Sequence, residues 1–387
     1  MNFNYFIPTS VEAGRGIAKN LGETFRSLGA EKIFLVTDKG IREAGLLNVI
    51  EKTLRSSSIS YEVFDQVIKN PSSESIMKGA AQLKAYGAKH VLAVGGGSSI
   101  DTAKGIALMA ENEGDILDYE GVNKVGNPGL DLTVIPTTAG TGSEVTASTI
   151  VTNTNTQFKA AVISPYLFPQ RALLDPLLTL QLPKEITAST GMDALTHAIE
   201  SYTSKTSNPV SEALAIRAIT LISENIEKSY FVADDMTSRE NMLIASMLAG
   251  AAFSQSRLGN VHAISHTFGG VFDIPHGIAN AVLLPYVMRF NLPACPQKMA
   301  EIAQALGQAP VGASIFNQAE SGIEAVIRLN ASLNIPGNIS ELGIDLKLLP
   351  KLVEDSMRSG NIHVNPRKTS SEDIETIIKK AYNERLE

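Results

Sequence analysis

The chain has 387 residues, of which 44% are hydrophobic and 19% charged, and this size and composition predict a globular protein of two domains. Its net charge of −7, without any basic run, argues against nucleic acid as a partner. A single cysteine, Cys295, excludes an intrachain disulfide, and the chain shows neither a signal peptide nor an apolar run of membrane-spanning length, so we expect a cytoplasmic protein with no membrane partner.

The first part of the chain alternates between short apolar runs and helical patterns. The runs at 31–38, 89–97 and 131–138 are typical of buried strands, and 73–87 has the pattern of a helix. The segment 157–176 is rich in proline and β-branched residues and predicts further strands and a connector. Strands separated by helices indicate a parallel sheet that is covered on both faces.

After residue 183 the character of the chain changes, and few strand signals remain. Long amphipathic patterns follow one another, at 191–204, 209–229, 238–256, 261–271, 297–306, 319–333 and 372–386. We therefore predict an α/β domain over 1–183 and an all-helical domain over 184–387. A cofactor at the strand ends of the first domain would face the second domain across a cleft.

The segment GGGSSIDTAKG (95–105) follows a predicted strand and opens a predicted helix. Glycines let the backbone come close to a bound group, and free N–H groups at a helix start favour an anion such as a pyrophosphate. The segment matches neither the G-x-G-x-x-G fingerprint nor a Walker A loop. An ordinary tight turn, with Ser98 as N-cap and Asp101 near the third helical position, explains it as well.

Two further features lie at predicted strand ends. Asp38 could accept hydrogen bonds from ribose hydroxyls and would repel a 2′-phosphate, which favours NAD over NADP, although an ordinary N-cap aspartate would look the same. The loop PTTAGTGSEVT (136–146) concentrates small hydroxyl side chains and glycines directly after an apolar run. This composition favours a loop that lines a bound nucleotide over a simple polar surface loop.

Acidic and imidazole side chains in the predicted helical domain have the spacing of a metal site. Asp193 and His197 are four residues apart, as are His262 and His266, and His276 follows. Residues four apart share one face of a helix, so each pair can aim two ligands at one point. Three imidazoles and one carboxylate suit Fe(II), Zn(II) or a similar ion. Hydrogen-bonded core histidines are the alternative, and His266 could be a ligand, a proton donor or a structural residue.

Taken together, these motifs resemble the iron-containing alcohol dehydrogenases, also called group III. GGGSSIDTAK, PTTAGTGSEVT, GMDALTHAIE and VHAISHTFGG…IPHGIANA match that family's patterns in the same order. The resemblance implies a Rossmann-like dinucleotide-binding domain and an all-helical metal-binding domain of the dehydroquinate synthase-like architecture, with NAD(H)-dependent interconversion of an alcohol and an aldehyde. It is strongest for the branch that contains 1,3-propanediol and methanol dehydrogenases, and it implies a short primary alcohol or diol as substrate.

The family's functional positions carry over to individual residues of this chain. The implied metal ligands, for Fe²⁺ or for Zn²⁺ or another divalent ion, are Asp193, His197, His262 and His276. His266 falls beside the metal site, where it and the cofactor ribose form the candidate proton relay. The implied NAD(H)-binding residues are Asp38, Asn70, Gly96, Gly97, Ser98, Thr137, Thr138, Thr146 and Lys159. The family also forms dimers and larger assemblies, so we expect a homo-oligomer.

Arg257 departs from the pattern of that branch, whose members tend to be uncharged at this position. If the guanidinium points into the cleft, it could clamp a sulfonate, phosphonate or carboxylate tail, which would make the enzyme a reductase of short anionic aldehydes. Two other classes are weaker. A dehydroquinate synthase-like lyase needs a cationic cluster that the second half lacks, and a metal-dependent hydrolase or a non-catalytic metal-binding protein leaves both nucleotide-type loops unexplained.

Overall fold

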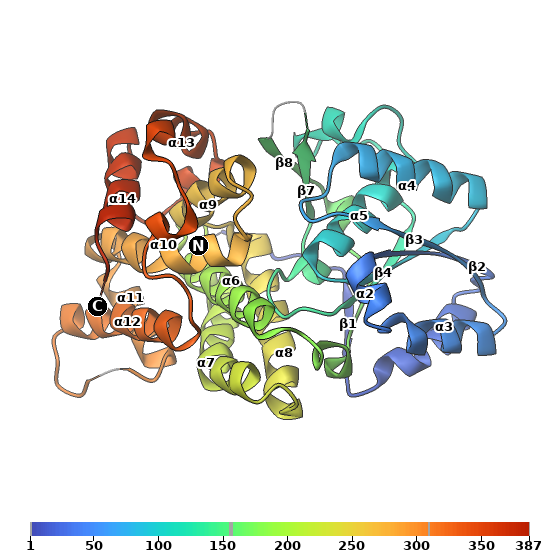
Figure 1. The fold of residues 1–387 in the computed structure, drawn as a ribbon, viewed down its shortest axis with the longest axis horizontal. Coiled ribbons are helices and arrows are strands. Elements are labelled where there is room, and N and C mark those ends of the chain that lie inside the picture. The colour runs from blue at the N-terminus through green and yellow to red at the C-terminus, as the bar shows by residue number, and fades with distance from the viewer. Residues whose placement is uncertain (1, 155–157, 309, 387) are drawn as a thin grey trace. The chain divides into compact units, whose positions relative to one another are not determined.

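The computed structural model describes residues 2–154, 158–308 and 310–386, so residue 157, where the predicted segment 157–176 begins, lies outside the described residues. The chain divides into two compact units, Ile7–Leu182 and Met1–Phe6 with Pro183–Glu387. The first is α/β and the second is helical, and the predicted fold class is confirmed (Figure 1).

The α/β unit is built on a six-stranded sheet in which every neighbouring pair is parallel, in the order β1-β9-β6-β4-β2-β3. Its strands are β1 (Ser10–Ala13), β2 (Lys32–Asp38), β3 (Ser60–Val67), β4 (His90–Gly95), β6 (Asp131–Pro136) and β9 (Arg171–Leu174). A second, three-stranded sheet contains β5 (Gly121–Val122), β8 (Phe158–Ile163) and β7 (Ser148–Asn153). The helices are α1 (Leu21–Ser27), α2 (Lys39–Glu43), α3 (Leu47–Ser56), α4 (Ser73–Tyr86) and α5 (Gly97–Ala110).

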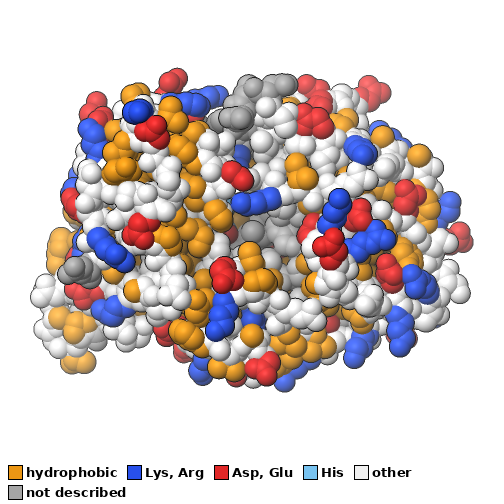
Figure 2. All heavy atoms as spheres, viewed as in Figure 1, with side chains coloured by type: hydrophobic (Ala, Val, Ile, Leu, Met, Phe, Trp, Pro, Cys, Tyr) orange, Lys and Arg blue, Asp and Glu red, His pale blue; other side chains and the backbone are white. Residues whose placement is uncertain are grey.

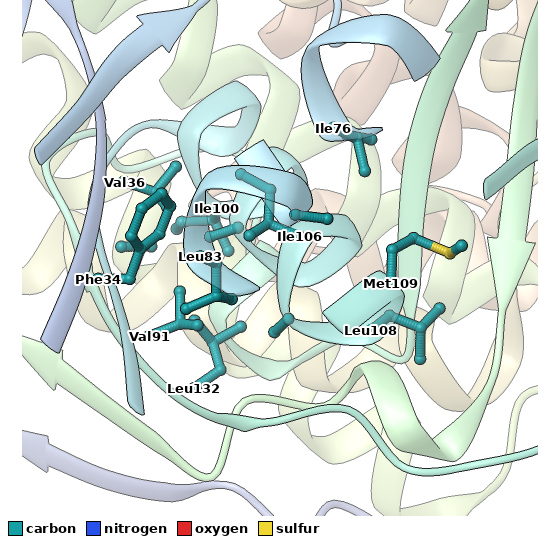
Figure 3. Packing of buried hydrophobic residues seen from close by; sticks show 14 of the residues in the cluster. Phe34, Val36, Ile76, Leu83, Val91, Ile100, Ile106, Leu108, Met109 and Leu132 are labelled. Atoms are coloured by element: carbon teal, nitrogen blue, oxygen red, sulfur yellow. The ribbon is translucent and has the colours of Figure 1, made fainter. Parts of the chain in front are cut away.

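Both faces of the large sheet are covered by helices. Because alternate residues of each strand point to opposite faces, nearly every residue of the central strands β2, β4 and β6 is buried. In β2, Phe34 and Val36 face the core shared with α4 and α5, whereas Ile33 and Leu35 face the core shared with α1 and α3. Figure 3 shows the first of these cores, in which Ile100 and Ile106 of α5 pack against side chains of the strands. This double burial explains why the strands read as continuous apolar runs in the sequence.

The helical unit contains nine α-helices among its described residues. They are α6 (Lys184–Thr203), α7 (Pro209–Phe231), α8 (Met236–Ser256), α9 (Asn260–Val271), α10 (His276–Asn291), α11 (Pro296–Ala305), α12 (Ile315–Ser332), α13 (Leu349–Met357) and α14 (Ser371–Asn383). The pattern at 191–204 had indicated only the second part of α6. Helix α10 was not predicted, because its residues are buried almost all round and leave no amphipathic period to read.

The predicted boundary after residue 183 assigns the first residues of the chain to the α/β domain, whereas the structure packs them with the helices. The Phe6 N–H donates to Gln255 Oε1 over 3.1 Å, and Gln255 Nε2 donates to the Phe6 carbonyl over 2.9 Å. This exchange of two hydrogen bonds fixes the segment on α8. No helix within the described ranges combines the length and the apolar character that a bilayer crossing needs.

The surface carries charges of both signs. On the face drawn in Figure 2, Lys and Arg side chains alternate with Asp and Glu side chains rather than gathering by sign. Interspersed charges of this kind do not form the continuous basic surface that a nucleic-acid backbone requires. On this face the charges therefore form no continuous patch of one sign.

Candidate metal centre and nucleotide loops

The predicted nucleotide-binding segments follow three neighbouring strands of the large sheet. Asp38 ends β2, Gly95 ends β4, and Pro136 ends β6, and these strands are adjacent in the order β2-β4-β6. From β2 the chain adds β3 on one side of the sheet, and it then returns to add β4 and β6 on the other side. The order in which strands are added therefore reverses between β2 and β4. Open parallel sheets bind ligands at such a switch point, outside the carboxyl ends of the strands.

The glycine loop and the threonine loop form one close-packed surface. A Cβ on Gly97 would lie 2.6 Å from the Thr141 methyl group, and a Cβ on Gly96 would lie 3.1 Å from Thr138 Oγ1. Helix α5 begins at Gly97, with Gly96 as its N-cap and no side chain bonded there. The alternative interpretation of an ordinary turn, in which Ser98 is the N-cap, was therefore wrong about the capping residue. Because no side chain occupies the helix start, its N–H groups suit an anion.

Asp38 has a structural partner on each side of its carboxylate. Its Oδ1 accepts the Ile41 N–H over 3.0 Å, so it is the N-cap of α2, and its Oδ2 accepts the Ser99 hydroxyl over 3.1 Å. Asp38 is thus an ordinary N-cap, as the alternative interpretation had it. The same two hydrogen bonds fix its carboxylate at the switch point. In the threonine loop after β6, the Thr137 hydroxyl is buried and has no hydrogen-bond partner within the described part of the chain.

A buried lysine that the sequence did not single out supports the threonine loop from behind. Lys104 Nζ, on α5, donates to the Thr146 carbonyl, the Thr146 hydroxyl and the Ser148 carbonyl, at 2.9, 2.9 and 2.8 Å. Burial lowers the pKa of Lys104 to about 8, although Asp101 and Glu144 oppose this shift. Burial likewise raises the pKa of the Glu144 carboxyl to about 7. The predicted cofactor residue Thr146 is itself buried, and its hydroxyl is engaged with Lys104.

Asn70 and Lys159, which lie far apart in the sequence, meet in the structure. Lys159 Nζ on β8 donates to Asn70 Oδ1 over 2.9 Å. Asn70 has a φ of 59°, a left-handed conformation that asparagine adopts more readily than most residues. The neighbouring backbone is fixed by a hydrogen bond of 2.6 Å from the Thr152 N–H on β7 to the Pro71 carbonyl. The amide and the ammonium group thus form one polar pair within the α/β unit.

In the helical unit, the predicted metal ligands converge from three helices. Asp193 and His197 lie one turn apart on α6, His262 lies in the first turn of α9, and His276 begins α10. Helix α10 packs against both α6 and α9. Asp193 Oδ1 is 3.9 Å from His197 Nε2, 3.9 Å from His262 Nε2 and 3.8 Å from His276 Nε2. The ligand atoms of Asp193, His262 and His276 all lie within 4.8 Å of one another.

Most of this cluster is buried, and His276 is its accessible member. The side chains of Asp193 and His262 are 4% and 1% exposed, whereas that of His276 is 28% exposed. His266 stacks on His276 with ring centroids 5.1 Å apart, so it lies on the accessible side. Burial lowers the pKa of His262 well below its ordinary value, and the neighbouring His197 adds to this shift. The His262 imidazole is therefore held in its neutral form, which is the form that binds a metal.

Two further residues complete the cluster. Glu200, one turn beyond His197 on α6, is buried, and its Oε2 lies 2.6 Å from His262 Nδ1. Asn280, one turn beyond His276 on α10, places its Nδ2 2.7 Å from Asp193 Oδ1, 3.1 Å from His262 Nε2 and 3.2 Å from His276 Nε2. Neither residue was predicted from the sequence. Glu200 could have been found from its spacing, because it lies on the same helix face as Asp193 and His197.

The donor set fits a divalent first-row ion. The separations around Asp193 Oδ1 exceed a hydrogen bond, and they approach the roughly 3.4 Å between two ligands of one tetrahedral ion with bonds near 2.1 Å. One carboxylate with three imidazoles suits Fe(II) or Zn(II). The Asn280 amide nitrogen lies against Asp193 Oδ1 and His262 Nε2, the same atoms that would bind an ion. The chemistry and convergence of these groups thus support a metal centre within the helical unit.

Arg257, the one residue that departed from the family pattern, does not favour an anion clamp. It ends α8 with a φ of 61°, and it is exposed. Its guanidinium packs against Gly360, where an added Cβ would lie 2.3 Å from a terminal nitrogen. The side chain is thus held against the backbone of the C-terminal segment, and an anionic-tail substrate gains no support.

Comparisons with known proteins match the whole chain. The family model of the iron-containing alcohol dehydrogenases matches residues 8–176, and the model of that family's C-terminal region matches 187–382. The 1,3-propanediol dehydrogenase of Citrobacter freundii is 41% identical over 98% of this chain and 99% of its own length. The NAD-dependent methanol dehydrogenase of Bacillus methanolicus is 38% identical over 98% and 99%. A crystal structure of 1,3-propanediol oxidoreductase superposes with a TM-score of 0.96 at 40% identity, covering 99% of this chain and 100% of its own.

Proposed function

The chain belongs to the family of iron-containing alcohol dehydrogenases, and we propose that it interconverts a short primary alcohol or diol and its aldehyde by hydride transfer with NAD(H). The observation that carries the proposal is the convergence of Asp193 and three histidine Nε2 atoms in a chain that also has glycine and threonine loops at a sheet switch point. The metal is Fe²⁺, with Zn²⁺ or another divalent first-row ion as alternatives.

We assign the metal-binding role to Asp193, His197, His262 and His276. A divalent ion at this position supplies a Lewis acid, which stabilises negative charge on the substrate oxygen in either direction of the reaction. The partly exposed His276 marks the side from which a small substrate enters, because the other ligands are nearly inaccessible. His266 stacks on His276 at that side, so its ring is placed to take up or return the proton of the alcohol.

We assign the cofactor to the edge of the large sheet where the strands β2, β4 and β6 end. The start of α5 at Gly96, Gly97 and Ser98 offers N–H groups to the pyrophosphate. Asp38 accepts from the ribose hydroxyls, and its charge disfavours the 2′-phosphate of NADP. The remaining contacts are assigned to Thr137, Thr138 and Thr146 of the threonine loop and to the Asn70–Lys159 pair. A cytoplasmic location and a homo-oligomeric state stay predictions from the sequence.

The test is an NADH-linked assay with short primary alcohols, 1,3-propanediol and their aldehydes, on protein loaded with Fe²⁺ and on the same protein after chelation. We expect turnover with uncharged substrates in the loaded protein, loss on chelation, and recovery when Fe²⁺ is returned. Full activity in the chelated protein would contradict the metal role. An Arg257→Ala variant serves as the control for substrate class, since its activity on uncharged aldehydes should equal that of the wild type.

A further inference from the structure

We propose that Glu200 is a positioning residue of the metal centre: it selects the imidazole tautomer of His262 that presents a free Nε2 lone pair to the ion. The inference rests on the proposed function in one respect, which is that a metal binds at Asp193, His197, His262 and His276. It assigns a role to a buried carboxylate that is not itself placed to be a ligand.

Both carboxylate oxygens of Glu200 face N–H groups. Oε1 accepts the Val261 N–H over 2.6 Å. Oε2 lies 2.6 Å from His262 Nδ1 and also accepts the His262 N–H over 3.4 Å. The first turn of α9 has no side-chain cap of its own, since its N-cap is Gly259. A Cβ on Gly259 would lie 2.9 Å from Glu200 Oε1, so the absence of a side chain there lets the carboxylate approach.

These contacts determine which nitrogen of His262 carries the hydrogen. A neutral imidazole has one N–H and one lone pair, and the nitrogen that faces an acceptor carries the hydrogen. A carboxylate at Nδ1 is an acceptor, so it places the hydrogen there and leaves a lone pair on Nε2. Asn280 is compatible with the same tautomer, because its Nδ2 can only donate and lies 3.1 Å from His262 Nε2. The contact with Glu200 therefore leaves the lone pair of His262 on Nε2, the nitrogen that faces Asp193.

The argument predicts that glutamine, despite its equal size, cannot replace Glu200. An amide has one oxygen and one NH₂ group. If the NH₂ group occupies the Oε1 position, it opposes the Val261 N–H, and two donors meet in a buried site. If it occupies the Oε2 position, it donates to Nδ1, which forces the hydrogen of His262 onto Nε2 and removes the metal-binding lone pair. Either arrangement weakens metal binding, whereas the overall shape of the side chain is kept.

The competing explanation is that Glu200 only caps α9. A cap contributes to the stability of the fold, and its loss lowers the melting temperature of the metal-free protein. It does not by itself alter the tautomer of His262 or the affinity of folded protein for a metal. Metal affinity, measured on metal-free protein shown by circular dichroism to be folded, therefore separates the two roles.

The first experiment compares Glu200→Gln with the wild type and with Glu212→Gln, which removes a glutamate of α7 that pairs with Lys298 rather than with the cluster. Zinc affinity is measured by competition with a chromophoric chelator. We expect a loss of 10- to 100-fold in Glu200→Gln, as for other residues that orient metal ligands, and no change in Glu212→Gln. A wild-type protein that binds no zinc overturns the proposed function together with this inference. Tight binding by the wild type and equal binding by folded Glu200→Gln overturns the inference alone.

A second measurement keeps the inference testable even if Glu200→Gln fails to fold. In metal-free wild-type protein with ¹⁵N-labelled histidine, the ring-nitrogen shifts of His262 report which nitrogen is protonated. The signals are assigned by their loss in a His262→Gln variant. We expect the hydrogen on Nδ1, and a predominant Nε2–H tautomer would overturn the proposal.

Discussion

The two units prepare their sites in opposite ways. In the helical unit, side chains converge on one point, and buried groups such as Glu200 and Asn280 orient them. In the α/β unit, the groups that we propose for the cofactor are largely backbone N–H groups beside glycines, and the buried Lys104 supports the neighbouring threonine loop. We conclude that the helical site depends on the ligand side chains themselves, whereas the α/β site depends on residues that hold its loops.

The largest expected effect tests the first half of this comparison. His262→Ala removes a ligand from a buried cluster, and we expect the protein to lose its metal and kcat/KM to fall by roughly 10³-fold or more, about 4 kcal/mol of lost stabilisation. NADH affinity, measured by fluorescence titration, should stay within about twofold, since the cofactor residues lie in the other unit. The exposed His363 provides the control, because His363→Ala should change neither quantity. Loss of NADH binding along with the metal would break the distinction between the two sites.

The second prediction tests the support of the threonine loop. Lys104→Met removes three hydrogen bonds and takes the ammonium donor away from the buried carbonyl of Thr146 and the partly buried carbonyl of Ser148. We expect NADH to bind roughly tenfold more weakly, equivalent to about 1.4 kcal/mol, and the free energy of unfolding to fall by about 2–4 kcal/mol. Zinc affinity should not change. Lys89→Met, at an exposed lysine, is the matched control, and a Lys104→Met protein with unaltered NADH affinity would show that the loop needs no such support.

The third prediction concerns the carboxylate at the switch point. Asp38→Asn keeps the N-cap of α2, because asparagine caps as well as aspartate, but it removes the charge that repels a 2′-phosphate. We expect the wild type to prefer NADH, and the ratio of kcat/KM for NADPH to that for NADH to rise roughly tenfold in the variant. Asp345→Asn alters an aspartate that also caps a helical turn, and it should leave the ratio unchanged. A wild type that prefers NADPH would refute the assignment of Asp38.

The last prediction concerns the pH dependence of stability rather than binding at either site. Burial raises the pKa of Glu144 from 4.5 to about 7, so the folded state holds a proton that the unfolded state releases. The associated stability is full below about pH 4.5 and is lost as the pH rises through 7. Glu144→Gln cannot titrate and lacks this loss. We therefore expect the free energy of unfolding of the variant, relative to that of the wild type, to be about 1–3 kcal/mol higher at pH 8 than at pH 5. Urea unfolding at both values measures this, and Glu111→Gln, an exposed glutamate, should show no such gain.

The sequence was sufficient to predict the features that depend on local spacing. Asp193 and His197 are one helical turn apart, and so are His262 and His266, and the structure keeps all four around one centre with His276. The alternation of apolar runs and helical patterns predicted the parallel sheet and the helical unit. The inferences about the fold succeeded because periodicity and the ends of parallel strands are fixed by the backbone rather than by distant contacts, and the metal-binding role of the clustered residues stays a prediction.

Features that depend on tertiary contacts could not be predicted in this way. Glu200 is one of many acidic residues on helices until α9 is placed against it, and Asn280 lies on a helix without a readable period. The interpretation of Ser98 as an N-cap failed for a related reason. The chain turns into α5 two residues earlier, at the point where Gly96 and Gly97 pack against Thr138 and Thr141. In each case the role of the residue depends on side chains or backbone from distant parts of the sequence.

The attachment of Phe6 to α8 has a consequence for the order in which the protein is made. Because residues before Ile7 pack with the helices, the α/β unit is inserted within the sequence of the helical unit. The inserted unit is continuous, so it can complete its fold on the ribosome while the helical unit still lacks its last helices. We expect the metal ligands to assemble only late in synthesis, since α10, which carries the last of them, follows most of the chain.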